Sequence, residues 1–416
     1  SRAPQPASRA PKTSLLCHIL AEKPLCYTST DMSTLTGLQC PECGEEFEAD
    51  VVQTVCESCD SPLLARYDLA QTARALQRER VSGRPAGLWR WAELLPVRDP
   101  GKRFTLGEGD SPLLPLRHIG ERLGLKRLYV KDEGVNPTGT FKARGMAVAL
   151  SRAIELGVEE AVAPTAGNAG GALANYAARA RIPAHVYMPR DAPASNQAEV
   201  LAAGSDLQLV EGTIEDAGRE AAAEARTRGW MNLSTFREPY RVEGKKTMGL
   251  ELAEDFEWEL PEVVIYPTGG GTGLVGMWKA FEELEEMGWV DSSRPRMVSV
   301  QSEACAPIVD AMQSGADRVV AAKSDPTRAP GLRVAKPYAD RLILRTLRES
   351  GGAAVAVSEG QIAASETELA GAEGIFACPE GAATLAGLKL LVEAGDIVPD
   401  DRVVLFNTGH GLKYLS

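Results

Sequence analysis

The sequence reads Asn136-Pro-Thr-Gly-Thr-Phe-Lys-Ala-Arg-Gly145 between a short apolar run typical of a strand, Leu128–Val130, and a longer apolar pattern with helical spacing. Lys142 is therefore predicted to lie in the first turn of a helix. A helix N-terminus carries partial positive charge and disfavours a cation, and burial beside Phe141 would disfavour it further. Both effects favour the neutral amine, which is the form that attacks carbonyls. The alternative is an ordinary solvated lysine, the commoner state of this residue type.

From about residue 106 onward, short β-branched runs alternate with longer Ala-rich stretches. This alternation is typical of parallel βαβ units and predicts an α/β body with open, mostly parallel sheets. The predicted strands are Leu128–Val130, Ala161–Ala163, Ala184–Met188, Leu207–Val210, Val263–Tyr266, Met297–Gln301, Ala353–Val357 and Val403–Phe406. The predicted helices include Gly171–Ala180, Asn196–Ala203, Glu215–Arg228, Leu274–Glu286 and Ala382–Ala394. Ligands of open α/β sheets bind beyond the carboxyl ends of strands, so the turns there are candidate sites.

Two of these turns offer polar side chains to a ligand. The turn Thr165–Gly171 contains Asn168, whose amide can donate to a phenolate oxygen, and its glycines let the backbone approach closely. The turn Asn407–Gly411 contains Thr408, whose hydroxyl can hydrogen-bond a ring nitrogen without protonating it. The alternatives are an ordinary Asn-Gly turn in the first case and a capped turn in the second.

A third turn, Thr268–Gly273, is unusually rich in glycine and precedes a predicted helix. Backbone amides at such a helix N-terminus form a cup suited to a phosphate monoester. A plain loop is the alternative, but this many glycines destabilise a loop unless the backbone must approach something closely. The candidate phosphate-binding residues are Gly269, Gly270, Gly271, Thr272 and Gly273.

Motifs of other enzyme classes are missing from the sequence. The spacing of Gly134 and Gly139 resembles a P-loop, but Thr140 follows where that motif needs lysine. No Rossmann fingerprint, Gly-x-Gly-x-x-Gly, follows the first strand, and the His-Glu-x-x-His and Gly-x-Ser-x-Gly motifs are lacking. A lysine, an amide, a phosphate cup and a neutral hydroxyl remain, and together they suit pyridoxal phosphate bound to Lys142.

Near the N-terminus, Cys40-Pro-Glu-Cys43 is followed after twelve residues by Cys56-Glu-Ser-Cys59. Two such pairs are typical of a structural zinc ribbon, in which Cys40, Cys43, Cys56 and Cys59 would close a tetrahedral site. The alternative is two unrelated pairs or a redox motif. The surrounding segment is acidic, which argues for a structural role and against nucleic-acid binding.

The 416-residue chain carries a net charge of -12, which disfavours nucleic acid or an anionic membrane as its main partner. No apolar run approaches the roughly 18 residues of a membrane span, so we expect a soluble cytoplasmic protein. The predicted divisions are a disordered tail over residues 1–34, a zinc ribbon over 35–66, a helical connector over 67–105 and a catalytic body over 106–416, with a small subdomain at about 145–250.

The motifs at 136–145, 166–170, 268–273 and 408–413 resemble, in that order, those of the threonine synthases. These belong to the tryptophan synthase β-like, fold type II enzymes that use pyridoxal 5'-phosphate, and several also carry a zinc ribbon. The resemblance covers about residues 106–416 and implies a two-domain homodimer with structural zinc. It implies that Lys142 forms the Schiff base and moves protons, that Asn168 contacts the cofactor's 3'-hydroxyl, and that Thr408 faces the pyridine nitrogen. The glycine-rich turn would cradle the cofactor's phosphate.

The segment Pro239–Thr247 resembles the family's Pro-aromatic-Arg-x-Glu-Gly-x-Lys-Thr pattern and makes Arg241 a candidate for binding a substrate phosphate. The alternative for Arg241 is a surface arginine. Thr165 and Lys246 complete the substrate-binding residues that the resemblance implies. The implied activity is that of a carbon-oxygen lyase of threonine biosynthesis, which converts O-phosphohomoserine and water to threonine and phosphate.

The sequence departs from the family pattern on the substrate side. Ala143 stands where threonine synthases usually have aspartate, and Ala169 where a hydroxyl residue often follows the asparagine. The run Leu233–Glu238 also differs from the usual Asn-Ser-x-Asn. Because loss of a polar contact can alter substrate discrimination strongly, a threonine or serine dehydratase, or another elimination or replacement enzyme of this fold, is the alternative function. A zinc-ribbon binding protein without catalysis is a third hypothesis.

Overall fold

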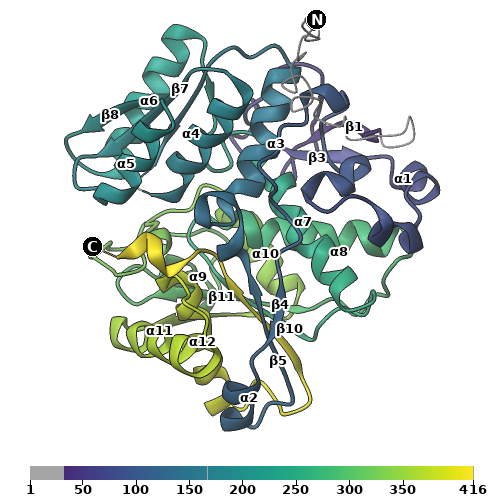
Figure 1. Ribbon diagram of the computed structural model, residues 1–416, viewed down its shortest axis with the longest axis vertical. Helices are drawn as coiled ribbons and strands as arrows, with labels where there is room; N and C mark the ends of the chain where they lie inside the picture. The colour runs from purple at the N-terminus through teal and green to yellow at the C-terminus, as the bar shows by residue number, and fades with distance from the viewer. Residues whose placement is uncertain (1–31, 166, 416) are drawn as a thin grey trace, which may run out of the picture.

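The computed structural model describes residues 32–165 and 167–415, which form two α/β domains and a small antiparallel module (Figure 1). The predicted disordered tail, residues 1–34, lies outside the described residues except for its last three. Within these ranges, no helix is long and apolar enough to cross a membrane.

The larger domain is built on a six-stranded sheet in the order β12-β11-β10-β13-β5-β4. The strands are β4 Leu113–Pro115, β5 Arg127–Asp132, β10 Val263–Pro267, β11 Arg296–Ser302, β12 Ala353–Val357 and β13 Arg402–Asn407. All neighbours are parallel except the edge strand β4, which runs antiparallel to β5. Its helices are α2 Arg117–Leu123, α7 Arg241–Asp255, α8 Thr272–Glu286, α9 Pro307–Ser314, α10 Asp340–Glu349, α11 Glu359–Glu373 and α12 Pro379–Glu393.

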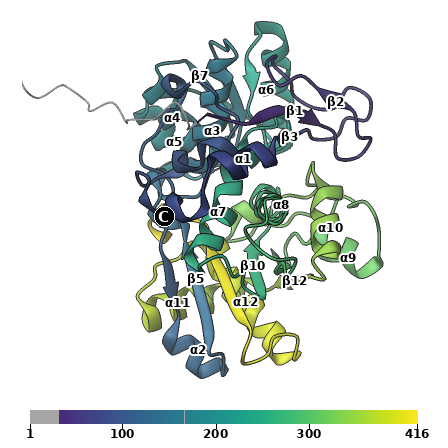
Figure 2. The ribbon, with the colours of Figure 1, turned by 90° about the vertical axis from the view of Figure 1, so that its right-hand side faces the viewer.

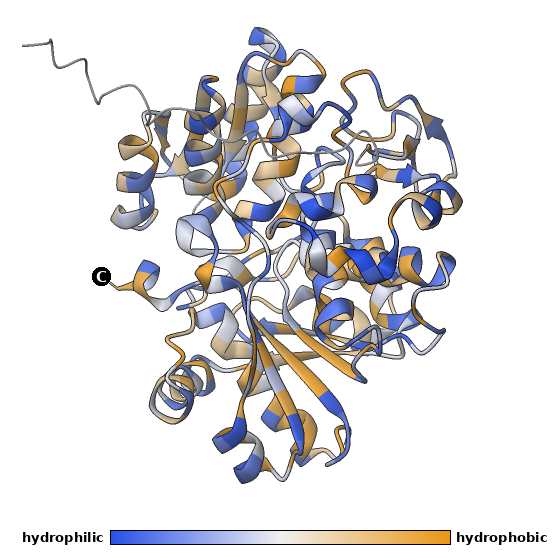
Figure 3. Cartoon of the chain, turned by 45° about the vertical axis from the view of Figure 1, so that its right-hand side comes forward, coloured by the Kyte–Doolittle hydropathy of each residue, from blue (hydrophilic) through white to orange (hydrophobic). Residues whose placement is uncertain are grey.

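Both faces of this sheet are covered because successive side chains of a strand point to opposite sides. Val263 and Ile265 pack with residues of α2, α11 and α12, whereas Val264 and Tyr266 pack with residues of α7, α8 and α10. Strands buried on both faces read as nearly continuous apolar runs, and Figure 3 shows these strands coloured mainly as hydrophobic.

The smaller domain has a four-stranded parallel sheet in the order β8-β7-β6-β9. Its elements are α3 Lys142–Glu155, β6 Ala161–Pro164, α4 Asn168–Ala180, β7 Ala184–Pro189, α5 Ala194–Ala202, β8 Asp206–Val210, α6 Ile214–Arg228 and β9 Met231–Asn232. Helix α6 covers one face, where Ala221 packs with Val162. Helix α4 packs on the other face, where Leu173 lies in the same core as Ala163, and α3 packs on α4.

All eight predicted strands are present, as are the five predicted helices with stated ranges and the helix predicted to begin near Lys142, and the α/β fold class with mostly parallel sheets is confirmed. Strands β4 and β9 were too short to produce a pattern. Helix α7 lacks an apolar period because charged residues occupy its buried positions, among them Arg241, Glu243, Lys246 and Glu251. Its buried charges are held by ion pairs and hydrogen bonds, while Val242, Met248 and Leu252 of the same helix pack in the apolar core.

The N-terminal module is a three-stranded antiparallel sheet in the order β2-β1-β3 (Figure 2). Its strands are β1 Leu35–Gln39, β2 Glu46–Phe47 and β3 Leu64–Tyr67, and the chain continues through α1 Leu69–Ala75 and short 3-10 turns over 78–83, 88–94 and 100–102. The module contacts both domains. Asp50 pairs with Arg152 of α3 at 2.9 Å, and Glu42 pairs with Arg345 of α10 at 2.7 Å.

Candidate active site

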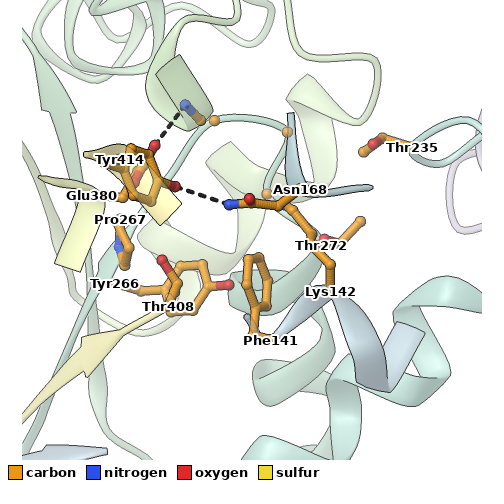
Figure 4. A pocket seen from close by; sticks show the side chains of 14 residues that line it. Phe141, Lys142, Asn168, Thr235, Tyr266, Pro267, Thr272, Glu380, Thr408 and Tyr414 are labelled. Atoms are coloured by element: carbon orange, nitrogen blue, oxygen red, sulfur yellow. Dashed lines mark hydrogen bonds between the residues drawn. The ribbon is translucent and has the colours of Figure 1, made fainter. Parts of the chain in front are cut away.

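A cavity lies where the two domains meet, at the carboxyl ends of β10 and β13 and beside the start of α4 (Figure 4). Such a crevice beyond the strand ends is the expected place for a ligand in this class of fold. The residues that line it are Phe141, Lys142, Asn168, Thr235, Tyr266, Pro267, Gly269, Gly270, Gly271, Thr272, Gly331, Glu380, Thr408 and Tyr414.

Lys142 is the first residue of α3, as predicted, and its Nζ lies 4.2 Å from the centroid of the Phe141 ring. Burial lowers the pKa of Lys142 to about 8, and the Arg241 guanidinium acts in the same direction, while Glu380 and Cys378 oppose the shift. About one fifth of this amine is therefore neutral and nucleophilic near physiological pH, far more than for an ordinary lysine.

The glycine-rich turn forms the part of the cavity wall next to α8. A side chain at Gly269 would place its Cβ 2.1 Å from the carbonyl oxygen of Gly331, and one at Gly271, where φ is +79°, would collide with Ile343. Only glycine therefore fits, and the backbone itself faces the cavity together with Thr272. The first N–H groups of α8 have no partner within the helix, so this wall suits a phosphate.

Asn168 and Thr408 reach the same cavity from opposite domains. Asn168 begins α4, and its Nδ2 donates to the Tyr414 hydroxyl at 2.9 Å. Thr408 follows β13, and its carbonyl oxygen accepts from the Phe141 N–H at 3.1 Å, which holds this turn beside Lys142. The hydroxyl of Thr408 has a weak partner in Cys378 Sγ at 3.7 Å. A buried amine, a glycine wall, an amide and a neutral hydroxyl in one cavity fit pyridoxal phosphate.

Four polar residues of the cavity, Thr235, Tyr266, Glu380 and Tyr414, were not predicted as site residues. Glu380 lies in the first turn of α12, is 4% exposed, and accepts the Gly331 N–H at 2.7 Å. Its position in an Ala- and Leu-rich helix gave no signal of a site. Tyr414 follows the predicted turn Asn407–Gly411 by three residues, so closeness to that turn was the signal that could have found it.

Of the predicted substrate-binding residues, Thr165 and Arg241 lie behind the cavity wall. The Thr165 hydroxyl accepts from the Gly167 N–H at 3.0 Å and so stabilises its own turn. Arg241 is 4% exposed and donates to the Leu233 carbonyl at 2.7 Å and, more weakly, to the Thr235 hydroxyl at 3.4 Å. Its buried Nε has no hydrogen-bond partner among the described residues. Since Thr235 lines the cavity, Arg241 is one side chain away from a ligand there.

The structure does not bring Lys246 to the cavity. Its Nζ forms ion pairs with Glu243 at 2.7 Å and Glu283 at 2.8 Å, and lies 4.0 Å from the centroid of the Tyr67 ring. The side chain is fully buried against the end of β3 rather than beside Lys142. The carboxylates of Glu243 and Glu283 neutralise the charge of Lys246. Although Lys246 belongs to the family-like segment Pro239–Thr247, its amine is therefore not available to a substrate.

The four cysteines of the N-terminal module come together as predicted. Their Sγ atoms all lie within 4.8 Å of one another, with Cys40 and Cys56 buried and Cys43 and Cys59 exposed. Four thiolates at this spacing fit a tetrahedral metal ion such as zinc.

Comparisons with known proteins agree with this geometry. Residues 104–409 match the family model described as "Pyridoxal-phosphate dependent enzyme". The threonine synthase of Methanosarcina acetivorans is 37% identical over 90% of this chain and 92% of its own. That of Methanocaldococcus jannaschii is 36% identical with the same coverage. Among solved structures, maize serine racemase shares the fold, at 21% identity and a TM-score of 0.62 over 72% of this chain and 88% of its own. Threonine deaminase isoform 2 from Solanum lycopersicum also shares it, at 23% identity and a TM-score of 0.62 over 72% of this chain and 83% of that one.

The lowered pKa of Lys142 predicts how its reactivity depends on pH. Below about pH 8 the protonated fraction dominates, so the labelling of Lys142 by an amine reagent should fall about tenfold per pH unit in the cofactor-free chain. Above that pH the rate should level off. Peptide mass spectrometry measures it, with the exposed Lys336 as an internal comparison. A rate that still rises steeply from pH 9 to pH 10 would contradict the shift.

The burial of Lys246 predicts a structural role. Lys246→Met should lower the free energy of unfolding by about 3–5 kcal/mol, because it leaves the buried carboxylates of Glu243 and Glu283 with fewer partners. Lys389→Met, which removes a surface pair with Glu368, should cost less than about 1 kcal/mol. Denaturant unfolding measures both changes. Unchanged stability with a raised KM for the amino-acid substrate would instead return Lys246 to the substrate site.

Proposed function

The chain belongs to the threonine synthases among the pyridoxal-phosphate dependent enzymes, and from that premise we propose how its residues convert O-phosphohomoserine and water to threonine and phosphate. The enzyme is a pyridoxal-phosphate-dependent carbon-oxygen lyase of threonine biosynthesis. The observation that carries the assignment of roles is the convergence of Lys142, Asn168, Thr408 and the glycine-rich turn on one cavity.

Lys142 holds the cofactor and transfers the protons of the reaction. When bound, pyridoxal phosphate supplies the electron sink that makes protons next to the amino group of the substrate removable. With the cofactor bound, the amine of Lys142 would take the α-proton of the substrate, and its conjugate acid would return a proton later in the cycle. A pKa near 8 suits both directions, because the amine can be a base and its conjugate acid a donor at the same pH.

The other cavity residues position the two reactants. The amides of the turn at Gly269–Gly271 and the hydroxyl of Thr272 would hold the cofactor's phosphate, Asn168 would hold its 3'-oxygen, and Thr408 would hydrogen-bond its ring nitrogen. A neutral hydroxyl there leaves that nitrogen unprotonated. Support for these roles comes from the family and from the lining of the cavity.

Arg241 is the residue we assign to the substrate's phosphate. Its guanidinium is buried with an unpartnered Nε, a costly arrangement that an anion would relieve. It is joined to the cavity through Thr235, whose hydroxyl lies 3.4 Å from Nη1. In the reaction the Cγ–O bond of O-phosphohomoserine breaks and phosphate leaves with the bonding electrons. Cβ loses a proton and gains the hydroxyl of water, and Cγ gains a proton to become the methyl group of threonine. A cation behind Thr235 stabilises the leaving group as it departs.

The direct test offers O-phosphohomoserine and threonine to the purified, cofactor-loaded chain in separate reactions. Release of phosphate with matching formation of threonine is the expected result, and Lys142→Ala should abolish it. Formation of 2-oxobutyrate from threonine, without phosphate release from O-phosphohomoserine, would assign the chain to the dehydratases instead.

Arg241→Gln should raise the KM for O-phosphohomoserine about 10- to 100-fold, the cost of losing hydrogen bonds to a charged group. The matched control is Arg237→Gln in the loop that precedes α7, because Arg237 lies against Tyr338 with its side chain 47% exposed. Initial rates of phosphate release measure both variants. Equal effects of the two substitutions, or no effect of Arg241→Gln, would remove Arg241 from the substrate site.

We also propose that the four-cysteine cluster binds one structural zinc ion. Elemental analysis of the purified chain should find about one zinc per chain. Cys43→Ser should lose the ion and expose residues 40–60 to protease, because a module this small has little core of its own. Cys305→Ser, at a buried cysteine outside the cluster, should keep it. Retention of zinc by Cys43→Ser would contradict the assignment.

A cytoplasmic location and a homodimeric assembly remain predictions from the sequence and the family.

A further inference from the structure

Glu380 is the one carboxylate among the residues that line the cavity. It is 4% exposed, and one of its oxygens accepts the Gly331 N–H at 2.7 Å. Gly331 packs in turn against the glycine-rich turn, where a Cβ at Gly269 would lie 2.1 Å from the Gly331 carbonyl oxygen. A carboxylate buried in this way is costly unless its charge has partners. The other partners of Glu380 therefore indicate its role.

The hydroxyl of Tyr414 donates its proton to the Glu380 carboxylate. Tyr414 ends the 3-10 turn Gly411–Tyr414 and lines the cavity. Burial raises the pKa of Tyr414 well above its usual value, and the charge of Glu380 acts in the same direction, so the phenol keeps its proton. A hydroxyl has only one proton to donate. Because Glu380 takes it, the oxygen of Tyr414 can only accept from another neighbour.

Asn168 is the neighbour that donates to Tyr414. Its Nδ2 lies 2.9 Å from the Tyr414 hydroxyl, and Figure 4 shows the two side chains directed toward each other. A carboxamide presents an NH2 group on one side and a carbonyl oxygen on the other, and its neighbours decide which faces where. With Tyr414 as an acceptor, the NH2 group must face it, and the second N–H of this group is left for a ligand. Glu380 thus fixes the orientation of the Asn168 amide through Tyr414.

Glu380 also acts on Lys142, which lines the same cavity. Burial lowers the pKa of Lys142 and the Arg241 guanidinium lowers it further, whereas the charge of Glu380 and, more weakly, that of Cys378 raise it. Lys245 of α7 is a further titratable neighbour, but burial lowers its pKa well below the usual range, so it adds no charge. Glu380 is therefore the main group that favours the protonated form of the Lys142 amine.

We propose that Glu380 is a positioning residue for two groups that meet the cofactor: it orients the Asn168 amide through Tyr414, and its charge balances that of the Lys142 ammonium. The inference rests on the cofactor roles proposed for Lys142 and Asn168, and not on which amino acid is the substrate. Glu380 makes and breaks no bond of the substrate. One carboxylate thus couples the residue that transfers protons to the amide that holds the cofactor.

The test compares four forms of the full chain stripped of cofactor: wild type, Glu380→Gln, Tyr414→Phe and the double variant. Glu380→Gln keeps the size of the side chain and an acceptor for the Gly331 N–H, but it removes the charge and replaces one oxygen by an NH2 group. Glu393→Gln is the matched control, because Glu393 is exposed at the far end of the same helix.

Two quantities are measured on each form. Equilibrium dialysis gives the affinity for pyridoxine 5'-phosphate, which keeps the phosphate and the 3'-oxygen of the cofactor. It has an alcohol in place of the aldehyde, so its binding does not depend on a reaction with Lys142. Peptide mass spectrometry gives the rate at which an amine reagent labels Lys142 at pH 7.

We expect Glu380→Gln and Tyr414→Phe each to weaken the binding of pyridoxine 5'-phosphate about three- to tenfold. The double variant should bind no more weakly than the weaker single variant, because both substitutions break the same chain of hydrogen bonds. Glu380→Gln should also speed the labelling of Lys142 about fivefold, since loss of a negative charge favours the neutral amine. Tyr414→Phe and Glu393→Gln should change that rate less than about twofold.

Losses of affinity that add up in the double variant would show that Glu380 does not act through Tyr414, and would overturn the proposal. Unchanged affinity or unchanged labelling in Glu380→Gln would also overturn it, as would a loss of stability in denaturant unfolding with neither of these changes. Failure of the wild-type chain to bind pyridoxal phosphate would instead overturn the cofactor assignment, and with it the proposed function.

Discussion

The buried guanidinium of Arg144 is the contact on which the site depends. Glu133 directly follows β5 and lies 2.6 Å from this guanidinium, and Glu251 of α7 lies 2.5 Å from it. All three side chains are at most 1% exposed. Charges removed from water in this way are stable only when every partner is in place. The network therefore fixes the start of α3 against both the sheet and α7. Lys142 lies two residues before Arg144, so its position is set by electrostatics behind the cavity rather than by its own contacts.

The dependence of buried charges on their partners also explains what could and could not be predicted from the sequence. Strands such as Val263–Tyr266 were predictable because burial on both faces makes them apolar throughout, and the turns after them followed from their glycines. Lys246 and Arg241 share one segment, yet one is neutralised by Glu243 and Glu283 and the other lies behind the cavity. Which charge pairs with which is decided by contacts between distant elements, and no local pattern records them. Glu380 was missed because its contact, the N–H of Gly331, comes from a distant part of the chain and its own helix is rich in Ala and Leu.

Ion pairs also attach the acidic N-terminal module to the two domains. Its carboxylates face arginines of the body: Glu42 pairs with Arg341 and Arg345 on α10, and Asp50 with Arg152 on α3. Several of these groups are partly exposed, so each pair contributes little stability, but together they orient the module on both domains. The acidic composition of this module argues against nucleic-acid binding. The structure shows that several of its carboxylates instead pair with arginines of the same chain.

The distribution of charge around the cavity also bears on the substrate. Ala143 is fully buried in an apolar core, so the carboxylate common at that position in the family has no counterpart beside Lys142. Among the residues that line the cavity, Glu380 is the one carboxylate, and Figure 4 shows it on the opposite side from Thr235. Arg241 lies behind Thr235. A dianionic phosphate is repelled from the Glu380 side and attracted to the Thr235 side. On the proposed role of Arg241, charge across the cavity would orient a phosphorylated amino acid even without an aspartate next to the lysine.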